Sequence, residues 1–123
     1  MQLSSNVNLF LGIQAQLKVF HWQTKGYARH NAFGMTLDSI DDLVDDFVEE
    51  AMGQYGRFML DDETNIIKLA NLSEVKAVEV ANTICEALVQ ITDQLDPKDT
   101  NLLNLRDEIL GKFQKLKYLL TLE

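Results

Sequence analysis

The chain has 123 residues, of which 46% are apolar and 24% charged, and its net charge is −8. This composition excludes a disordered chain, and the acidic balance without a Lys/Arg cluster disfavours binding to the phosphate backbone of DNA. No apolar run approaches the ~20 residues of a transmembrane helix, the N-terminus lacks a signal-peptide pattern, and Cys85 is the one cysteine. We therefore expect one domain over residues 1–123, cytoplasmic, with no membrane partner.

Apolar residues recur with the period of an α-helix in four segments of the chain. The first predicted helix covers about residues 5–24, and Gly26 is expected to close it in the left-handed conformation. The second covers about residues 31–54, with Gly53 and Gly56 at its end. Both helices carry one apolar stripe, which predicts that each packs against a partner helix.

The connector of residues 57–72 is too long for an ordinary bundle loop. Its acidic Asp62 and Glu63 precede an apolar cluster at residues 66–70, a pattern that predicts a short helix.

Ser73 is a good N-cap for a third helix, which is expected to continue to about residue 95. Pro97 stops it and starts a fourth helix that continues nearly to the end. The fold predicted is all-α: a four-helix bundle with one long crossover between helices 2 and 3 that carries a short extra helix.

The residues most suited to chemistry are the only two histidines, His21 and His30, and a run of carboxylates on the second helix. Asp45 and Glu49 stand four apart on one flank of that helix, and Asp38 lies on the same flank. Imidazole and carboxylate together suit iron and related divalent metals. The alternatives are a solvated acidic face, structural histidines and, for the neighbouring Trp22, a packing or interface anchor.

The segment His21-Trp22-Gln23-Thr24-Lys25-Gly26, followed by His30 and by Asp45 and Glu49, resembles the Dps-type miniferritins of the ferritin-like family. The resemblance extends, less specifically, to the glycine-led connector at Gly56 and to the last helix. It implies a ferritin-like bundle and a homo-oligomer built from dimers, up to a dodecameric shell.

The resemblance also implies an intersubunit site for iron. In it, His21 and His30 of one subunit would meet Asp45 and Glu49 of the two-fold partner, and Trp22 would quench radicals nearby. The implied activity is that of a ferroxidase, which oxidises Fe(II) with peroxide or oxygen and stores or detoxifies the iron.

Three departures from the family's pattern support an alternative function. Gly34 stands where the family usually has a further carboxylate, so that Asp38 would have to compensate. Nine positions separate His21 from His30, fewer than usual, and there is no lysine-rich tail for DNA. The alternative is a non-catalytic, structural or interaction oligomer that has lost part of the metal site.

Overall fold

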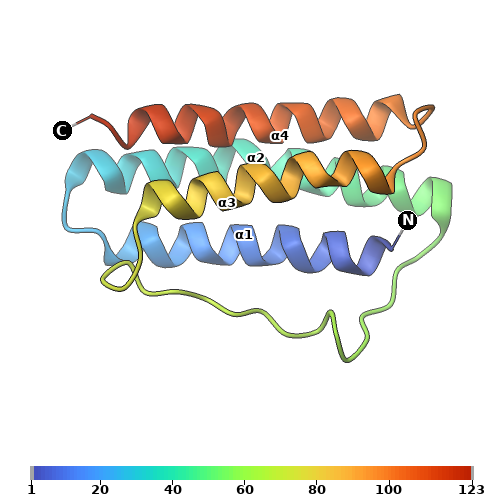
Figure 1. The fold of residues 1–123 in the computed structure, drawn as a ribbon, viewed down its shortest axis with the longest axis horizontal. Coiled ribbons are helices and arrows are strands. Elements are labelled where there is room, and N and C mark those ends of the chain that lie inside the picture. The colour runs from blue at the N-terminus through green and yellow to red at the C-terminus, as the bar shows by residue number, and fades with distance from the viewer. Residues whose placement is uncertain (1, 123) are drawn as a thin grey trace.

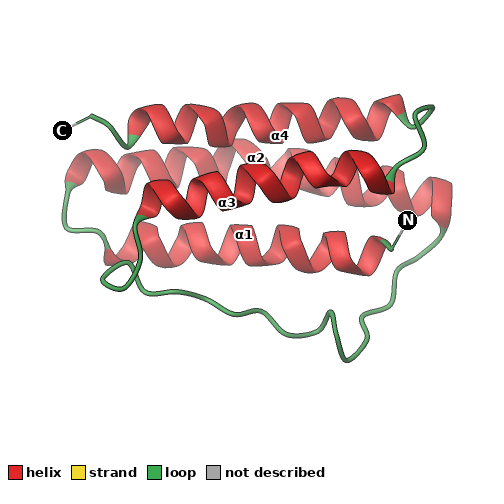
Figure 2. Ribbon diagram, viewed as in Figure 1, coloured by secondary structure: helices red, strands yellow, loops and turns green. Residues whose placement is uncertain are grey.

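The computed structural model describes residues 2–122, and this part of the chain contains four α-helices, one 3-10 turn and no strand (Figures 1 and 2). The elements are α1 (Leu3–Gln23), α2 (Tyr27–Tyr55), α3 (Ala77–Gln90), η1 (Ile91–Gln94) and α4 (Thr100–Leu119). The prediction of an all-α chain with four helices is confirmed. Within residues 2–122, no helix is long and apolar enough to cross a membrane.

The helices lie side by side, and the one long connection runs between α2 and α3 (Figure 1). Successive close contacts join α1 to α2, α2 to α4 and α4 to α3, whereas α1 and α3 are not a closely packed pair among the described residues. The connection, residues 56–76, returns along the outside of α1 on the side of α3 (Figure 1). We call this segment the strap.

The core is formed by the apolar side chains that recur with the period of the helix and so lie on one face of each helix. Five phenylalanines are among its fully buried side chains, and two pairs of them join α1 to α2. The rings of Phe10 and Phe47 meet edge to face at 5.1 Å, and those of Phe20 and Phe33 are tilted at 5.5 Å. Burial also raises the pKa of the Cys85 thiol, which is the behaviour of a packed side chain.

The turn between α1 and α2 is tighter than expected. Gly26 has φ −89° and is the N-cap of α2, so the prediction that it closes the first helix in the left-handed conformation is wrong. Because α2 already begins at Tyr27, His30 lies inside the helix rather than in a loop. The positive φ appears instead at Gly56, at +90°, where α2 ends and the strap begins.

The short helix predicted in the connector is also wrong. Residues 56–76 contain turns near residues 62–65 and 72–75 but no helix, and α3 begins at Ala77 rather than at Ser73. The physical reason is that the strap's backbone finds hydrogen-bond partners on the side chains of α1, so it does not need the bonds of its own helix.

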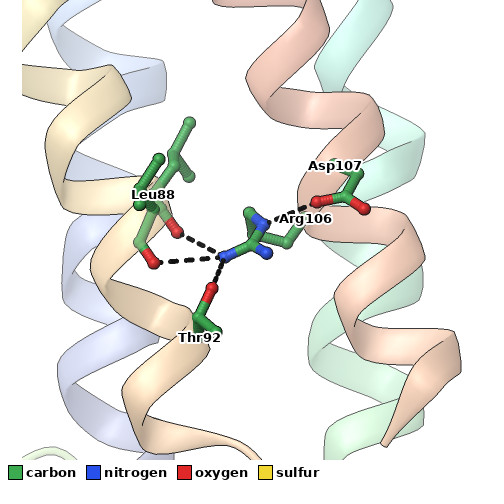
Figure 3. A network of polar contacts seen from close by, with 5 residues as sticks. Leu88, Thr92, Arg106 and Asp107 are labelled. Atoms are coloured by element: carbon green, nitrogen blue, oxygen red, sulfur yellow. Dashed lines mark hydrogen bonds and ion pairs between the residues drawn. The ribbon is translucent and has the colours of Figure 1, made fainter. Parts of the chain in front are cut away.

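The third helix ends at Gln90 and passes into the 3-10 turn, earlier than the predicted residue 95. Arg106 of α4 reaches this point: its guanidinium donates to the carbonyl oxygens of Leu88 (3.0 Å) and Val89 (3.3 Å) and to Oγ1 of Thr92 (2.6 Å) (Figure 3). A cation is favourable at a helix C-terminus, where carbonyl groups lack partners. Arg106 therefore fixes the end of α3 against α4.

Candidate functional site

The two histidines meet at the turn between α1 and α2. Their rings stack with centroids 3.8 Å apart, and Nδ1 of each ring lies against the carbonyl oxygen of the other residue, at 2.8 Å for His21 and 2.9 Å for His30. Since a carbonyl only accepts, each Nδ1 carries a proton and donates. The His21 carbonyl belongs to the last turn of α1, where no backbone partner is available within the helix. We call this reciprocal arrangement the histidine clasp.

Gly34 is part of the same arrangement. A Cβ at this position would stand 2.9 Å from Cε1 and 3.0 Å from Nδ1 of His21, closer than side chains approach. The imidazole thus lies directly on the helix backbone of α2. The glycine that departs from the expected carboxylate is explained by the packing of His21.

Trp22 and Tyr27 flank the clasp and are exposed, at 68% and 74%. The Nζ of Lys18 lies 5.7 Å from the Trp22 ring centroid, a cation–π distance, and the Tyr27 ring is 6.4 Å from that of His30. Trp22 is therefore a surface side chain, and the role of radical quencher expected for it stays a prediction.

The carboxylates predicted for the metal site lie elsewhere. Asp38, Asp45 and Glu49 are exposed on α2, and Asp45 is about 22 Å along the helix axis from His30 at 1.5 Å per residue. In the described part of the chain, no group of three or more His, Cys, Asp or Glu side chains is placed to hold a metal ion. One chain brings His21 and His30 together but not the carboxylates, and the expectation of an intersubunit iron site stays a prediction.

The sequence interpretation missed a row of amides that ties the strap to α1. The Nδ2 of Asn8 donates to the carbonyl oxygens of Thr64 and Ile66, each at 2.8 Å. Gln16 bonds both backbone groups of Ala70, donating at 2.9 Å and accepting at 2.8 Å. The Gln16 amide thus supplies a donor and an acceptor to one backbone residue, as a neighbouring β-strand would.

The row ends at Gln23. Its Nε2 donates to the side chain of Asn71 at 2.9 Å, and its Oε1 accepts from the backbone N–H of Leu72 at 2.8 Å. The three amides stand at residues 8, 16 and 23, which at about 100° per residue fall within about 80° of one another around the helix and so line one side of α1. That spacing is a signal the sequence carries.

The strap has its own local structure around Asp61. Its Oδ1 accepts from the backbone N–H groups of Glu63 and Thr64 and from Oγ1 of Thr64, each at 2.9 Å. These bonds, the Thr64 hydroxyl first, lower the pKa of the Asp61 carboxyl because they stabilise its charged form. Thr64 itself is buried, so the turn is pinned to the bundle.

Large apolar side chains are exposed along the strap. Met59 is 82% exposed, Ile66 63% and Leu69 48%, and Leu60 and Ile67 join them between residues 59 and 69. Two adjoining hollows, of about 780 Å³ and about 230 Å³, lie where the strap, α1 and α3 meet. Both are lined by Gln16, Lys68, Val80 and Ile84, and together we call them the strap groove.

Comparison with known proteins finds one relative over nearly the whole chain. It is a protein of Enterobacteria phage T4 described as an uncharacterized 14.6 kDa protein in the mobD-ri intergenic region. The two are 30% identical over 117 residues, which cover 95% of this chain and 86% of the phage protein. No solved structure matches, and the ferritin-like assignment of the bundle therefore stays a prediction.

The resemblance to the Dps-type miniferritins is wrong, because the family model that matches residues 21–120 is that of a family of unknown function, DUF5856, and not a ferritin-like one. In this structure the residues of that motif, His21, His30 and the turn at Lys25 and Gly26, close the α1–α2 hairpin. The chain belongs to the DUF5856 family.

Proposed function

We propose that this protein is a protein-interaction module, which binds its partner through the strap and the strap groove. The observation that carries the proposal is the row of exposed apolar side chains at residues 59–69, set beside an apolar groove. Exposed apolar surface of this kind, on a segment that is otherwise well fixed, is typical of binding sites.

The length and irregularity of the strap support the same proposal. A loop longer than about 12–15 residues without secondary structure is uncommon in a compact domain unless it is functional or disordered. The strap is not a loose segment, since Asn8, Gln16 and Gln23 hold its backbone. Fixing an apolar segment on the outside of α1 presents a preorganised surface, which lowers the entropic cost of binding.

A second set of exposed apolar side chains lies on α1 and α2, and it supports the proposal less. Its members, Leu11, Trp22, Tyr27 and Met35, are spread over residues 11–35. Two of them are already engaged within the chain, Trp22 by Lys18 and Tyr27 beside the His30 ring. Singly exposed apolar residues are normal on a protein surface.

An interaction module is close to the alternative function that the sequence suggests, a non-catalytic structural or interaction protein. The iron-oxidising activity was expected from the miniferritin resemblance alone, and that resemblance is withdrawn. The histidine clasp and its packing on Gly34 do not depend on that resemblance, because they are contacts within the chain.

The proposal is tested with a variant that makes the strap polar, Ile66→Ser/Leu69→Ser, against a control with two changes on the other face, Leu11→Ser/Met35→Ser. Proteins captured by immobilised wild-type chain are identified by mass spectrometry, purified and titrated against all three chains. We expect the strap variant to lose about tenfold or more in affinity, because interface energy is concentrated in a few apolar anchors. The proposal would be contradicted by a partner that binds the strap variant as tightly as wild type, or whose affinity falls only for the control variant.

A further inference from the structure

The positive charges of the chain are concentrated in two segments that contain no negative charge. Residues 1–37 and residues 109–122 hold six of the eleven Lys and Arg and no Asp or Glu. The six cations are Lys18, Lys25, Arg29, Lys112, Lys115 and Lys117. All 19 carboxylates lie in the rest of the chain, so the net charge of −8 conceals a strong separation of charge.

The fold brings these two segments together at one end of the bundle. The turn between α1 and α2 and the C-terminal end of α4 lie at the same end (Figure 1). Arg29 of α2 joins them directly, since its Nη2 donates to the carbonyl oxygen of Leu120 at 3.3 Å. These two residues are 91 positions apart in the sequence, which is why the sequence shows no Lys/Arg cluster. We call residues 18–29 and 112–122 the basic end.

Exposed aromatic rings lie at the same end. Trp22, Tyr27 and Tyr118 are exposed, at 68%, 74% and 63%, and each stands within three residues of a lysine. The Nζ of Lys18 lies 5.7 Å from the Trp22 ring centroid, so a group stacked on that ring would have a cation beside it. A fourth exposed ring, Tyr55, lies at the opposite end of α2.

The cations of the basic end outnumber the carboxylates beside them. Within residues 2–122 the one side-chain ion pair joins Arg106 to Asp107, so none of the six cations takes part in one. Carboxylates and a further cation, Lys76, border the basic end at two hollows, one of which is also lined by Lys112 and Lys115. These carboxylates are Asp42 and Glu108 beside α4 and Glu74 and Glu79 at the start of α3. Seven cations against four carboxylates leave the surface positive.

Lysine and arginine beside exposed rings form the kind of surface that binds single-stranded nucleic acid. The cations contact phosphates, and an unpaired base stacks on an aromatic ring because its faces are free. In a duplex the bases already stack on one another, so the rings of Trp22, Tyr27 and Tyr118 would find no partner. The carboxylates of the rest of the molecule repel phosphates, so a strand would be held at the basic end alone.

We propose that the basic end is a binding site for single-stranded nucleic acid, on a surface separate from the strap. Lys25, Lys115 and the other cations contact its phosphates, and the three exposed rings stack on its bases. Arg29 is half-buried and holds the two segments together through the Leu120 carbonyl, so it is a positioning residue.

The first test is the binding of a fluorescein-labelled oligothymidylate of about 16 nucleotides, measured by anisotropy between about 50 and 200 mM salt. At the lowest salt we expect a Kd of about 10 µM or tighter, which rises with salt because counterions are released on binding. With unlabelled strand, we expect quenching of the fluorescence of Trp22, the only tryptophan of the chain. A chain that shows neither signal at the lowest salt would overturn the proposal.

Variants that remove charge locate the site. Lys25→Gln/Lys115→Gln removes two exposed cations of the basic end, and Arg57→Gln/Lys98→Gln, the matched control, removes two exposed cations from the opposite end. The first variant is expected to bind about tenfold more weakly and to lower the slope of log Kd against log salt by about 1.4, since each phosphate contact contributes about 0.7. The control should change Kd less than about twofold. Equal losses in the two variants, both shown to be folded by circular dichroism, would assign the effect to net charge and overturn the site.

Stacking is tested separately from charge. Tyr27→Leu/Tyr118→Leu keeps apolar side chains but removes two rings, and it is expected to weaken binding about fivefold or more with the salt slope unchanged. An unchanged Kd in this variant, or a duplex of the same length bound as tightly as the single strand, would overturn the proposal.

Two further measurements separate this site from other surfaces. Vesicles that contain phosphatidylserine and bind the chain, while the oligonucleotide does not, would overturn the proposal in favour of an anionic membrane surface. The strap variant Ile66→Ser/Leu69→Ser is expected to bind the strand as wild type does. This proposal and the interaction module can therefore fail independently of each other.

Discussion

At the scale of single residues, the positions of His21, His30 and Gly34 depend on one another. His21 and His30 exchange hydrogen bonds with each other's backbone carbonyls, and the His21 ring needs the space that Gly34 leaves. Glycine inside a helix costs about 1 kcal/mol relative to alanine, so its presence at this place in α2 needs a reason. Contact with the imidazole provides it.

Substituting Gly34→Ala in the wild-type chain is expected to give no stabilisation, because the added methyl displaces the His21 ring and weakens its bond to the His30 carbonyl. The same substitution in a His21→Ala chain should stabilise by about 1 kcal/mol, the ordinary helix preference of alanine. The coupling between the two sites, about 1–2 kcal/mol, is measured from urea denaturation of the four chains. Equal effects of Gly34→Ala in both backgrounds would show that the contact has no energetic consequence.

A titration prediction concerns Asp61. Since the Thr64 hydroxyl is the largest cause of its lowered pKa, Asp61 is expected to titrate below its ordinary value of 3.8, and in a Thr64→Val chain the titration midpoint moves back toward that value. With a folded pKa below the unfolded one, the contribution to stability is present above the unfolded pKa and is lost as pH falls through the folded pKa. The carboxyl carbon shift followed by NMR measures both chains. An unchanged midpoint in Thr64→Val would contradict the assigned cause.

At the scale of elements, the joint between α3 and α4 depends on one side chain. Replacing Arg106 with Met removes the charged donor from the Leu88 carbonyl, which keeps the backbone N–H of Ile91, and from Oγ1 of Thr92, and we expect a loss of about 2–3 kcal/mol in the free energy of unfolding. The matched control is Asp107→Asn, which removes the 2.9 Å ion pair with Arg106 at a side chain that is 62% exposed. That control should cost less than about 0.5 kcal/mol. If both variants lost a similar free energy of unfolding, the ion pair with Asp107 would be the source of the stabilisation instead.

The fastening of the strap to α1 leads to a prediction about local exchange. In Gln16→Ala the backbone of Ala70 loses both of its partners, so amide protons around residues 66–72 are expected to exchange about tenfold faster, the equivalent of one lost bond of about 1.4 kcal/mol. Gln14→Ala is the control, since its amide bonds Asp41 on α2 and not the strap. Hydrogen exchange by mass spectrometry compares the two. Equal exchange in both chains would mean that the amide does not hold the strap.

Helices could be predicted where an apolar pattern with the helical period determines them. Segments whose conformation depends on contacts with distant parts of the chain could not. The apolar stripes predict four helices, and the stripe residues Phe10, Phe20, Phe47 and Phe113 are fully buried in the structure. The short connector helix was expected because acidic residues before an apolar cluster favour one locally. It is absent because amides far away in the sequence, such as Gln16, bond that backbone instead.

The site was harder to predict for a related reason. The sequence singles out His21 and His30, and the structure stacks their rings, but a motif cannot say whether two imidazoles bind a metal or close a helix turn. The close approach of the His21 ring to Gly34 is likewise visible only in the folded chain. The strap surface was missed because exposed apolar residues such as Ile66 and Leu69 look, in the sequence, like the buried stripe of a helix.

At the scale of the whole molecule, charge and apolar surface are separated. The carboxylates of α2 cover one side of the bundle, while the strap covers the side where α1 and α3 do not pack closely. A bundle that leaves one side to a fixed, irregular and apolar segment has a surface suited to a partner. We expect this surface to be covered by a bound partner when the protein functions in the cell.

Photo-crosslinking in cells that produce the protein tests this claim most directly. A photoreactive phenylalanine derivative is placed at Ile66 in one chain and at Asp46, on the acidic side of α2, in a control chain. We expect a discrete crosslinked species from the strap position alone. The mass of that species in excess of the 14.0 kDa chain gives the mass of the partner. No discrete species from the strap, or the same species from both positions, would contradict the account.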